Sequence, residues 1–434
     1  MNKKIVYIGL TADTIHHGHI NLIEKGRSYG ELIVGLLTDE AVSDYKRIPL
    51  LNYEQRKKIL INIKGINKVV PQNDWDYSKN IKKYKPDFML HGTDWNTGPQ
   101  VKLKQNALKE LKKYGGKLIE IPYTKGVSST ALSMEESKKY TTSELRLKKL
   151  SRLLEAKKFL RIIETHNPIS ALIAENVNIN LKNKFREFDG FWSSSLTDST
   201  SMGKPDIEAL DISERLNNIN KIFDVTSKPL IMDIDTGGKI EHLKLNIRSM
   251  ERLGISAVIM EDKTGLKKNS LNEKTSNQQQ DTIKNFSEKI NEISNTKLND
   301  EFMVVARIES FILGKGINDA LLRAKSYVEA GANGIMIHSK EKTPNEVFSF
   351  SDKFRKLYPD LPLVCVPSTY NTVKEESLIR KKFNIVIYAN HLLRAAYPAM
   401  TNTAKSILKH GRSKESDKKM ISIKEILKLV PGTS

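Results

Sequence analysis

Short apolar runs that end in polar residues recur along this sequence from about residue 190 onward, with helical patterns between them. The runs are GFWSSS near 190, PLIMDIDTG at 229–237, AVIMED at 257–262, MVVARIES at 303–310, GIMIHSK at 334–340, PLVCVPS at 362–368 and IVIYANH at 385–391. Because they do not alternate apolar and polar residues, they are typical of strands covered on both faces. Seven such strands over roughly 200 residues favour a (β/α)₈ barrel, whose active site forms at the carboxyl ends of the strands.

An earlier series of the same kind precedes the barrel. Short strand-like runs are expected at 3–10, 31–38, 87–92 and 117–123, with helical patterns at 18–29, 53–63 and 100–114. This alternation predicts an α/β domain with a Rossmann-like parallel sheet. The predicted organisation is therefore a nucleotide-binding domain at 1–135, a polar linker at 136–150, a barrel at 151–410 and a charged tail at 411–434.

The composition is that of an ordinary soluble protein, with 434 residues of which 39% are hydrophobic and 28% charged. No apolar run approaches the roughly 18 to 20 residues that a membrane span requires. The N-terminal MNKKIVYIGL has no signal-peptide cleavage region, and the single cysteine, Cys365, excludes an internal disulfide. These features predict a cytoplasmic protein.

The formal net charge of +20 raises the question of a nucleic-acid partner, because phosphate binding is largely electrostatic. The lysines, however, are spread along the whole chain, mixed with acids and with few aromatic residues between them. This distribution favours a solvated surface that steers small anionic substrates. We therefore expect neither nucleic acid nor a membrane among the partners.

Three acids follow two neighbouring runs: Asp233, Asp235 and Glu261. Mg²⁺ prefers oxygen ligands of this kind and usually keeps several waters in its shell. Residues two apart on a strand point the same way, which predicts that the two aspartates face one site. The groups that can neutralise or hydrogen-bond a phosphoryl group are Lys267, Asn269 and Arg307. Together these residues predict a small phosphorylated carboxylate bound through Mg²⁺.

The segment EDKTGLKKNS at 261–270 resembles the EDKxxxKxNS gating-loop signature of phosphoenolpyruvate mutases, members of the isocitrate lyase/phosphoenolpyruvate mutase superfamily. The resemblance continues in order through ETHNPISALIAE, FWSSSLTDSTSMGKPD, MDIDTGG, VARIESFILGKG, AGANGIMIHSK and YANHLLRA. It implies a Mg²⁺-dependent barrel enzyme that isomerises phosphoenolpyruvate to phosphonopyruvate.

The resemblance also implies residue roles. The residues that match metal-binding positions are Asp233, as the direct Mg²⁺ ligand, and Asp235 and Glu261, which hold its waters. The residues in the segment that touches substrate are Trp192, Ser194, Ser195 and Leu196. The residues that match catalytic positions are Asp206, near the transferring phosphoryl group, Lys267 and Asn269, on the loop that closes over substrate, and Arg307 and His338, which contact the phosphoryl group and substrate.

Two features distinguish this chain within the superfamily. Ser195 stands where the family usually has glycine, so its side chain could crowd the pocket. The superfamily's lyases carry a catalytic cysteine in a KKCGH-type motif, and nothing like that motif occurs here. Cys365 lies within the apolar LVCVP run, where we expect it to belong to the core, and lyase chemistry is not expected.

A second motif follows the first strand. His16 and His19 flank Gly18 in an HxGH arrangement, which resembles the nucleotidyltransferase superfamily. There the histidines contact nucleotide phosphates at a helix N-terminus. Further similarity lies in DYKRIPLLNYEQR, in HGTDW and in KGVSSTAL, which is similar to the RTxGISTT signature of cytidylyltransferases. The implied nucleotide-binding residues are Leu10, Thr11, His16, His19, Lys46, Arg56, Asp94, Ser128, Ser129 and Thr130, of which the two histidines are also catalytic.

One position departs from that signature. Tyr123 replaces its leading arginine, and Lys125 follows two residues on. Either Lys125 supplies the missing charge or triphosphate binding is weaker, and the sequence leaves both open.

The two resemblances together imply one phosphonate pathway. The barrel would make phosphonopyruvate, and the N-terminal domain would transfer CMP from CTP to a downstream phosphonate, 2-aminoethyl- or 2-hydroxyethylphosphonate. Two alternatives remain from the residues: a phosphonopyruvate hydrolase in the barrel, beside a nucleotidyltransferase of other acceptor specificity, and a non-catalytic scaffold that binds anions. Barrels of this family commonly form dimers or tetramers, so self-association is expected.

Overall fold

The computed structural model of the chain describes residues 3–96, 100–122, 141–181, 184–265, 267 and 278–429. They belong to two compact units. The first comprises 1–140, 155–157 and 178–186, and the second comprises 141–154, 158–177 and 187–434.

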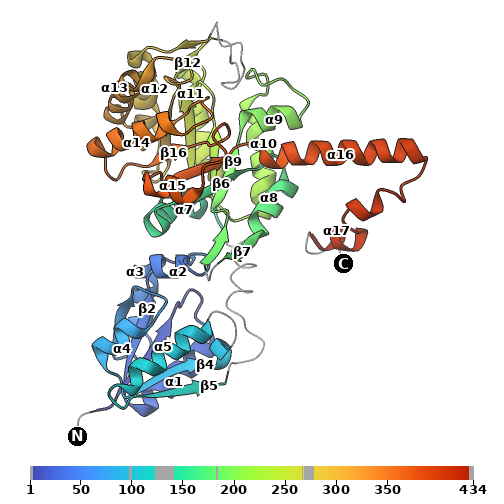
Figure 1. Cartoon of the computed structure of the whole chain (residues 1–434). Helices are drawn as coiled ribbons and strands as arrows, with labels where there is room; N and C mark the ends of the chain where they lie inside the picture. The colour runs from blue at the N-terminus through green and yellow to red at the C-terminus, as the bar shows by residue number, and fades with distance from the viewer. Residues whose placement is uncertain are drawn as a thin grey trace. The chain divides into compact units, whose positions relative to one another are not determined.

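The first unit is built on a parallel sheet of five strands in the order β3-β2-β1-β4-β5 (Figure 1). The strands are β1 (Ile5–Leu10), β2 (Glu31–Leu37), β3 (Lys68–Gln72), β4 (Phe88–Gly92) and β5 (Lys117–Ile121). The helices are α1 (His17–Tyr29), α2 (Asp39–Ser43), α3 (Tyr53–Ile61), α4 (Ser78–Tyr84) and α5 (Gln100–Lys112), with the 3₁₀ turn η1 (Thr93–Asn96).

Both faces of this sheet are covered. Val6 and Ile8 of β1 pack in one apolar cluster, and Tyr7 between them packs in another. The strand order reverses between β1 and β4, and open α/β sheets bind ligands at the carboxyl ends of strands at such a point. The HxGH motif follows β1 and HGTDW spans the end of β4, so both motifs lie at this crevice.

The second unit is a closed parallel barrel with the strand order β10-β11-β14-β15-β16-β17-β6-β9. Its strands are β6 (Leu160–Glu164), β9 (Gly190–Ser193), β10 (Leu230–Asp233), β11 (Ala257–Glu261), β14 (Met303–Ile308), β15 (Gly334–Ile337), β16 (Leu363–Cys365) and β17 (Ile385–Tyr388). Its surrounding helices are α7 (Ser143–Lys157), α8 (Pro168–Asn176), α9 (Ser195–Ser201), α10 (Ile212–Val225), α11 (Ile240–Leu253), α12 (Ile283–Thr296), α13 (Gly316–Glu329), α14 (Asn345–Leu357) and α15 (Glu375–Arg380).

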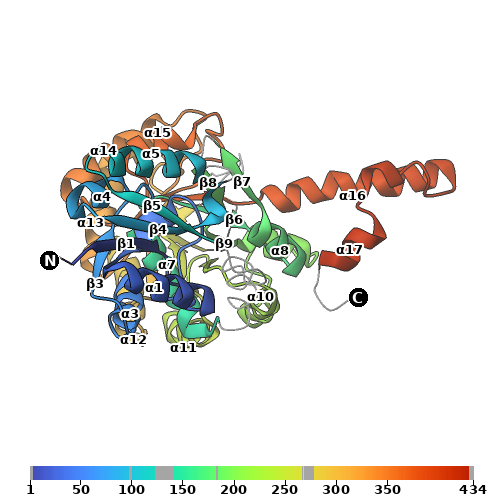
Figure 2. The ribbon, with the colours of Figure 1, turned by 90° about the horizontal axis from the view of Figure 1, so that it is seen from below.

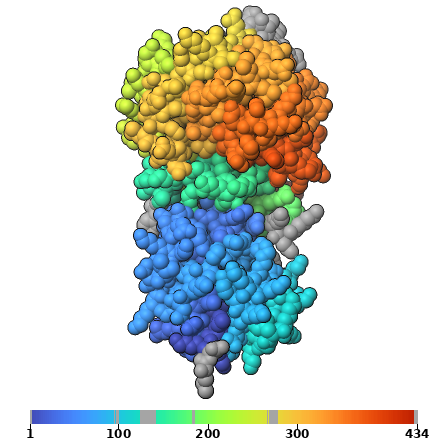
Figure 3. All heavy atoms as spheres, turned by 90° about the vertical axis from the view of Figure 1, so that its left-hand side faces the viewer, coloured from blue at the N-terminus to red at the C-terminus, as the bar shows by residue number. Residues whose placement is uncertain are grey.

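The barrel strands are almost wholly buried, as the apolar runs predict. Cys365 is one of these core residues. Figure 3 faces the side of the barrel that carries α12 to α14, and there the helices form a closed surface over the strands. Two short two-stranded ribbons are also present: β12 (Lys263–Thr264) with β13 (Gln279–Gln280) in the second unit, and β7 (Asn178–Leu181) with β8 (Lys184–Glu187), nearly all of which belongs to the first unit.

The predicted fold class is confirmed for both units, but three details differ from the sequence prediction. The sheet has a strand, β3, that the sequence did not indicate, and the eighth barrel strand is β6, which the sequence did not indicate either. Residues 143–150, predicted as linker, form the first two turns of α7.

The chain continues past the barrel in α16 (His391–His410), the turn η2 (Asp417–Lys419) and α17 (Ile423–Leu429). Figures 1 and 2 both show α16 projecting away from the barrel, and no residue of α16 or α17 is buried. Among the described residues, no helix combines the length and the apolar character needed to cross a membrane.

Candidate active site

The carboxyl ends of β10 and β11 bring the three predicted acids together. Asp233 and Glu261 are the last residues of their strands, and both are buried. Asp235 is also buried, but it lies beyond β10 in a turn with a φ of 53°. The two aspartates therefore are not related by strand alternation as predicted. Instead, Asp233 Oδ1 accepts a hydrogen bond from the amide of Asp235 at 3.0 Å, which closes the turn.

Lys267 lies among these acids. Its ammonium group pairs with Asp206 Oδ1 at 2.6 Å, with Asp235 Oδ1 and with the hydroxyl of Ser195. The same hydroxyl donates to Asp233 Oδ2 at 3.1 Å. Ser195, the residue that departs from the family pattern, thus connects the predicted metal ligand with the predicted catalytic lysine.

A second group of charges surrounds Arg307 at the end of β14. Arg307 pairs in register with Glu261, and its Nη2 lies 3.3 Å from Glu261 Oε2. Its Nε donates to Glu309 Oε1 at 2.5 Å, and its Nη2 lies 3.1 Å from His338 Nδ1. The sequence predicted a site role for Arg307 and His338, and the structure brings them together with Glu261.

The environment of the acids shifts their pKa values in different directions. Burial acts on Asp233, but Lys267 and Arg307 outweigh it and hold the pKa of this carboxyl below its usual value. Burial raises the pKa of Asp235, and the neighbouring Asp233 carboxylate adds to that rise. Burial also raises the pKa of Glu261 to about 7, although Arg307 opposes the shift. The pocket therefore favours the ionised form at Asp233 and would gain from a cation near the other two acids.

The predicted substrate segment runs from the end of β9 into α9. Trp192, Ser194 and Ser195 are buried and Leu196 is half-buried. The indole Nε1 of Trp192 is buried and makes no hydrogen bond with the described part of the chain. Such a group is satisfied when a ligand or water reaches it.

Several charged residues of this region were not assigned a role from the sequence. Arg215 on α10 donates to Asp198 Oδ2 at 3.0 Å and to the carbonyl of Asp233 at 2.6 Å. Lys263 lies 3.2 Å from Glu261 and 3.6 Å from Glu309. For Lys263 and Glu309 a signal was present, because both follow apolar runs. For Arg215 there was none, since its partners are distant in sequence.

In the first unit, the two motif histidines meet at the start of α1. His16 is the N-cap, and its Nδ1 accepts from the amide of Gly18 at 3.1 Å. The rings of His16 and His19 lie 4.0 Å apart, centroid to centroid. Burial lowers the pKa of His16 and lowers that of His19 to about 4, with His16 and Lys46 adding to the latter shift. Both imidazoles are therefore neutral at pH 7.

Other predicted nucleotide-binding residues hold the loops around this motif. Arg56 is fully buried, and its guanidinium donates to the carbonyls of Leu51 and Thr11 and to Asp39. Leu10 ends β1 in the core. The geometry of Arg56 suits positioning of the Thr11 loop rather than direct reach toward a ligand.

Asp13, three residues before His16, was not assigned from the sequence. Its carboxylate accepts from the amides of Leu50 and Leu51 at 2.8 and 3.4 Å. Its position three residues before the HxGH motif is the sequence feature that could have identified it. Ala12 beside it has a φ of 53°, an uncommon conformation that tends to occur at functional sites.

Some predicted residues lie outside the described part of the chain: Asn269, Tyr123, Lys125, Ser128, Ser129, Thr130 and the side chain of Asp94. Next to Asp94, the ring of Trp95 stacks on that of His91 at 3.8 Å.

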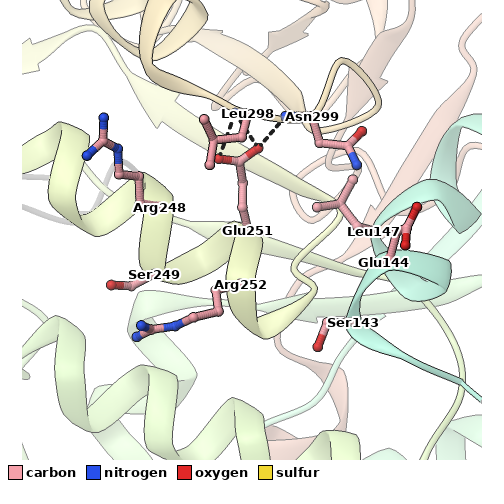
Figure 4. Close-up of a pocket in the computed structure, with 9 residues that line it drawn as sticks. All are labelled: Ser143, Glu144, Leu147, Arg248, Ser249, Glu251, Arg252, Leu298 and Asn299. Atoms are coloured by element: carbon pink, nitrogen blue, oxygen red, sulfur yellow. Dashed lines mark hydrogen bonds between the residues drawn. The ribbon is translucent and has the colours of Figure 1, made fainter.

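A pocket at the opposite end of the barrel is a poor candidate for the active site. It is lined by Ser143, Glu144, Leu147, Arg248, Ser249, Glu251, Arg252, Leu298 and Asn299 (Figure 4). The Glu251 carboxylate accepts from the amides of Leu298 and Asn299, at 3.0 and 2.9 Å to Oε1. These loops precede β11 and β14, and that end of such barrels serves stability.

Comparison with known proteins relates the barrel to one family. The model of the phosphoenolpyruvate phosphomutase family matches residues 150–408. A phosphoenolpyruvate phosphomutase of Tetrahymena pyriformis is 32% identical over 67% of this chain and 93% of its own length. A phosphonopyruvate hydrolase of a Variovorax strain is 36% identical over 64% of this chain and 91% of its own. A solved phosphonopyruvate hydrolase, in complex with oxalate and Mg²⁺, has a TM-score of 0.58 and 33% identity over 66% of this chain and 94% of its own.

The first unit has relatives of its own. A cytidylyltransferase-like family model matches residues 7–162. A glycerol-3-phosphate cytidylyltransferase of Bacillus spizizenii is 35% identical over 31% of this chain and 96% of its own length. The chain is therefore an enzyme that belongs to the phosphoenolpyruvate phosphomutase family through its barrel and to the cytidylyltransferase-like family through its N-terminal domain.

Proposed function

We propose that the barrel isomerises phosphoenolpyruvate to phosphonopyruvate in a Mg²⁺-dependent reaction. The observation that carries this proposal is the meeting of three buried acids with Lys267 and Arg307 at one end of the barrel. A small phosphorylated carboxylate is anionic at both ends, so it needs cationic groups at each. The basic residues and a metal held by the acids would supply them.

The donor set fits a hard divalent cation. All three acids offer carboxylate oxygens, and Asp235 Oδ1 and Glu261 Oε1 accept no hydrogen bond from described residues, although both are ion-paired with lysines. Among described residues, no three metal-binding side chains form a ready-made cage. Mg²⁺ needs only one or two direct carboxylates because it keeps its waters. Asp233 would be the direct ligand, and Asp235 and Glu261 would hold the waters.

The reaction is a phosphoryl transfer within one bound molecule. The P–O bond of phosphoenolpyruvate breaks to leave pyruvate enolate and a metaphosphate-like group, and C3 of the enolate then attacks phosphorus. Loose transition states of this kind need positioning and charge neutralisation more than a strong base. Mg²⁺, when bound, adds Lewis-acid neutralisation of the substrate oxygens.

Different residues of the chain would position the substrate and neutralise its charge. Arg307 can hold phosphoryl oxygens bidentately, and Lys267 acts as a point charge next to Asp206. Burial and Arg307 lower the pKa of His338, so this side chain contacts the substrate as a neutral imidazole. Asn269 completes the proposed set of substrate contacts.

Phosphorus NMR of the full chain with phosphonopyruvate and Mg²⁺ tests the proposal. A mutase converts phosphonopyruvate to phosphoenolpyruvate, whereas a hydrolase releases pyruvate and inorganic phosphate. The hydrolase is the second candidate, because a relative of that name is 36% identical to this chain. Free phosphate as the main product would reject the mutase and establish that candidate. Full turnover by Asp206→Ala would instead reject the catalytic role assigned to Asp206, and a wild type that binds phosphonopyruvate without converting it would favour an anion-binding scaffold.

For the N-terminal domain we propose transfer of CMP from CTP to a phosphonate. A phosphonate oxygen attacks the α-phosphorus of CTP, and pyrophosphate leaves. His16 and His19 would contact the phosphates as neutral groups at the N-terminus of α1, where the backbone amides also favour negative charge. Lys46 would offset the charge of the triphosphate.

The acceptor follows from the chemistry of the first reaction. Phosphonopyruvate is a reactive oxo acid that has to be decarboxylated, and then reduced or aminated, before it becomes a stable product. We therefore propose 2-aminoethyl- or 2-hydroxyethylphosphonate as the acceptor. Pyrophosphate release from CTP, measured with each phosphonate and with glycerol 3-phosphate, checks this. Release with glycerol 3-phosphate alone would overturn the phosphonate assignment, and unchanged release in a His16→Ala/His19→Ala double variant would overturn the site.

A further inference from the structure

We infer that Asp262, the residue after Glu261, is a positioning residue for the barrel reaction, because it fixes the ends of the strands that carry Glu261 and Arg307. Asp262 is fully buried, and none of the proposed contacts with substrate or metal involves it. The inference rests on the proposed isomerase function, since only that function gives Glu261 and Arg307 their roles.

The Asp262 carboxylate gathers four hydrogen-bond donors. Its Oδ1 accepts from the amide of Glu309 at 2.9 Å. Its Oδ2 accepts from the hydroxyl of Tyr327 at 2.8 Å, from Gln280 Nε2 at 2.8 Å and from Arg323 Nη1 at 3.1 Å. Consecutive residues at a strand end point in opposite directions. The side chain of Asp262 accordingly points toward α13, while Glu261 meets the charges at the mouth of the barrel.

The backbone of Asp262 adds two further connections. Its amide donates to the carbonyl of Arg307 at 3.1 Å, and its carbonyl accepts from the amide of Asp281 at 2.9 Å. One residue therefore joins the end of β11, the end of β14 and the chain after β13. Arg323 strengthens the junction, because its Nη1 also donates to the carbonyl of Asp281 at 2.9 Å.

This junction bears directly on the reaction. Glu261 and Arg307 lie opposite each other in the β11–β14 register, with 3.3 Å between Oε2 and Nη2. Under the proposed function one holds a metal-bound water and the other holds the phosphoryl group. A displacement of about 1 Å between such groups can cost roughly a hundredfold in rate. The carboxylate of Asp262 fixes that distance from the side of the strand ends that faces α13, where neither substrate nor metal would contact it.

The test uses the full chain with Asp262→Asn, a change that keeps the shape and removes the charge. Calorimetry with oxalate in the presence of Mg²⁺ measures stoichiometry and affinity separately. We expect one oxalate per chain, as in the wild type, with a dissociation constant raised at least tenfold and kcat for phosphonopyruvate lowered at least tenfold. A merely structural role would instead lower the stoichiometry and leave the affinity of the remaining sites unchanged, and that result overturns the inference.

A milder variant and a matched control complete the experiment. Tyr327→Phe removes one donor to Asp262 without changing any charge, and we expect a two- to fivefold rise in the oxalate dissociation constant. Asp319→Asn makes the same chemical change at the other acid bound to Arg323, where Nε lies 3.0 Å from Oδ2. It should leave affinity and kcat within twofold of the wild type, and a loss equal to that of Asp262→Asn would overturn the inference.

The wild type separates the two possible failures. If it neither binds oxalate nor converts phosphonopyruvate to phosphoenolpyruvate, the proposed function fails and the inference falls with it. If the wild type does both and Asp262→Asn and Tyr327→Phe match it, only the role of Asp262 is wrong.

Discussion

Arg215 compensates much of the buried negative charge beneath the candidate site. It is 3% exposed, donates to Asp198 and to the carbonyl of Asp233, and lies 3.8 Å from Asp235 Oδ2. Removing one partner of such a buried set leaves the others uncompensated, which costs about 3–5 kcal/mol. We therefore expect Arg215→Met to lower the free energy of unfolding of the barrel by about that amount in urea titrations.

An exposed ion pair on the same barrel serves as the control. Lys204 lies 3.1 Å from Glu214, and both side chains are substantially exposed. Exposed pairs contribute roughly 0–1 kcal/mol, so Lys204→Met should change the unfolding free energy little. Similar losses in Lys204→Met and Arg215→Met would contradict the importance assigned to burial.

His19 makes the stability of the chain depend on pH. Its pKa is lowered to about 4 in the folded state by burial, His16 and Lys46, while an unfolded histidine has a pKa of about 6.5. Between these values the unfolded chain binds more protons than the folded chain, so stability falls as the pH falls. Urea unfolding at pH 7 and pH 5 should show a smaller pH effect in His19→Gln than in the wild type. Equal effects would show that His19 is not the group responsible.

Some contacts in the candidate sites could be predicted from the sequence and others could not. Glu261 and Arg307 could be paired from the sequence, because each follows an apolar run and strand ends of a parallel barrel lie together. The roles of Lys267 and Asp206 were implied by the resemblance alone, and the ion pair between them, at 2.6 Å, was not predicted. The contacts of Arg215 and Asp262 could not be predicted from the sequence, because their partners are separated from them by 17 to 65 residues. Local patterns contain no information on such pairings.

At the scale of elements, there are physical reasons why the sequence did not indicate the sheet strand β3 and the barrel strand β6. β3 contains Pro71, which strands tolerate mainly at a sheet edge, and β3 is the edge strand of its sheet. β6 follows α7 with hardly a break in the apolar periodicity, and the helix ends at Lys158 through a left-handed φ of 59°. A lysine carries no signal for this conformation, whereas the glycine directly after α11 is a typical residue at such a helix end.

That glycine, Gly254, permits a specific prediction about the end of α11. It has a φ of 97°, and a Cβ atom built on it would lie 2.8 Å from the backbone of Ser143 at the start of α7. Left-handed backbone alone costs an alanine about 1 kcal/mol. Gly254→Ala should exceed that cost by at least about another 1 kcal/mol, because two backbones must separate. The measurement is the urea midpoint of the barrel transition.

Gly411, which caps α16, is the matched control for this measurement. Its φ is 61°, and nothing lies within 4 Å of a Cβ atom built there. Gly411→Ala should therefore show the conformational cost alone. If the two variants lose equal stability, the close approach between α11 and α7 does not contribute.

At the scale of the whole molecule, α16 is the element that the single chain leaves unexplained. None of its 20 residues is buried, and several of the exposed side chains are large and apolar: Tyr397 is 70% exposed, Met400 62% and Leu408 84%. Large exposed apolar side chains gathered on one element are typical of a protein interaction site. Together with the predicted self-association, this favours contacts between copies of the chain through α16.

Sedimentation velocity tests this last prediction. The wild type should sediment as a dimer or larger, well above the 49.3 kDa of one chain. Tyr397→Ser/Met400→Ser should shift the distribution toward the monomer, because the change removes apolar surface that a second copy would bury. Leu298→Ser is the control, since Leu298 is 82% exposed but lies between α12 and β14, outside α16. A wild type that sediments as a monomer at micromolar concentration would exclude α16 as an interface between copies.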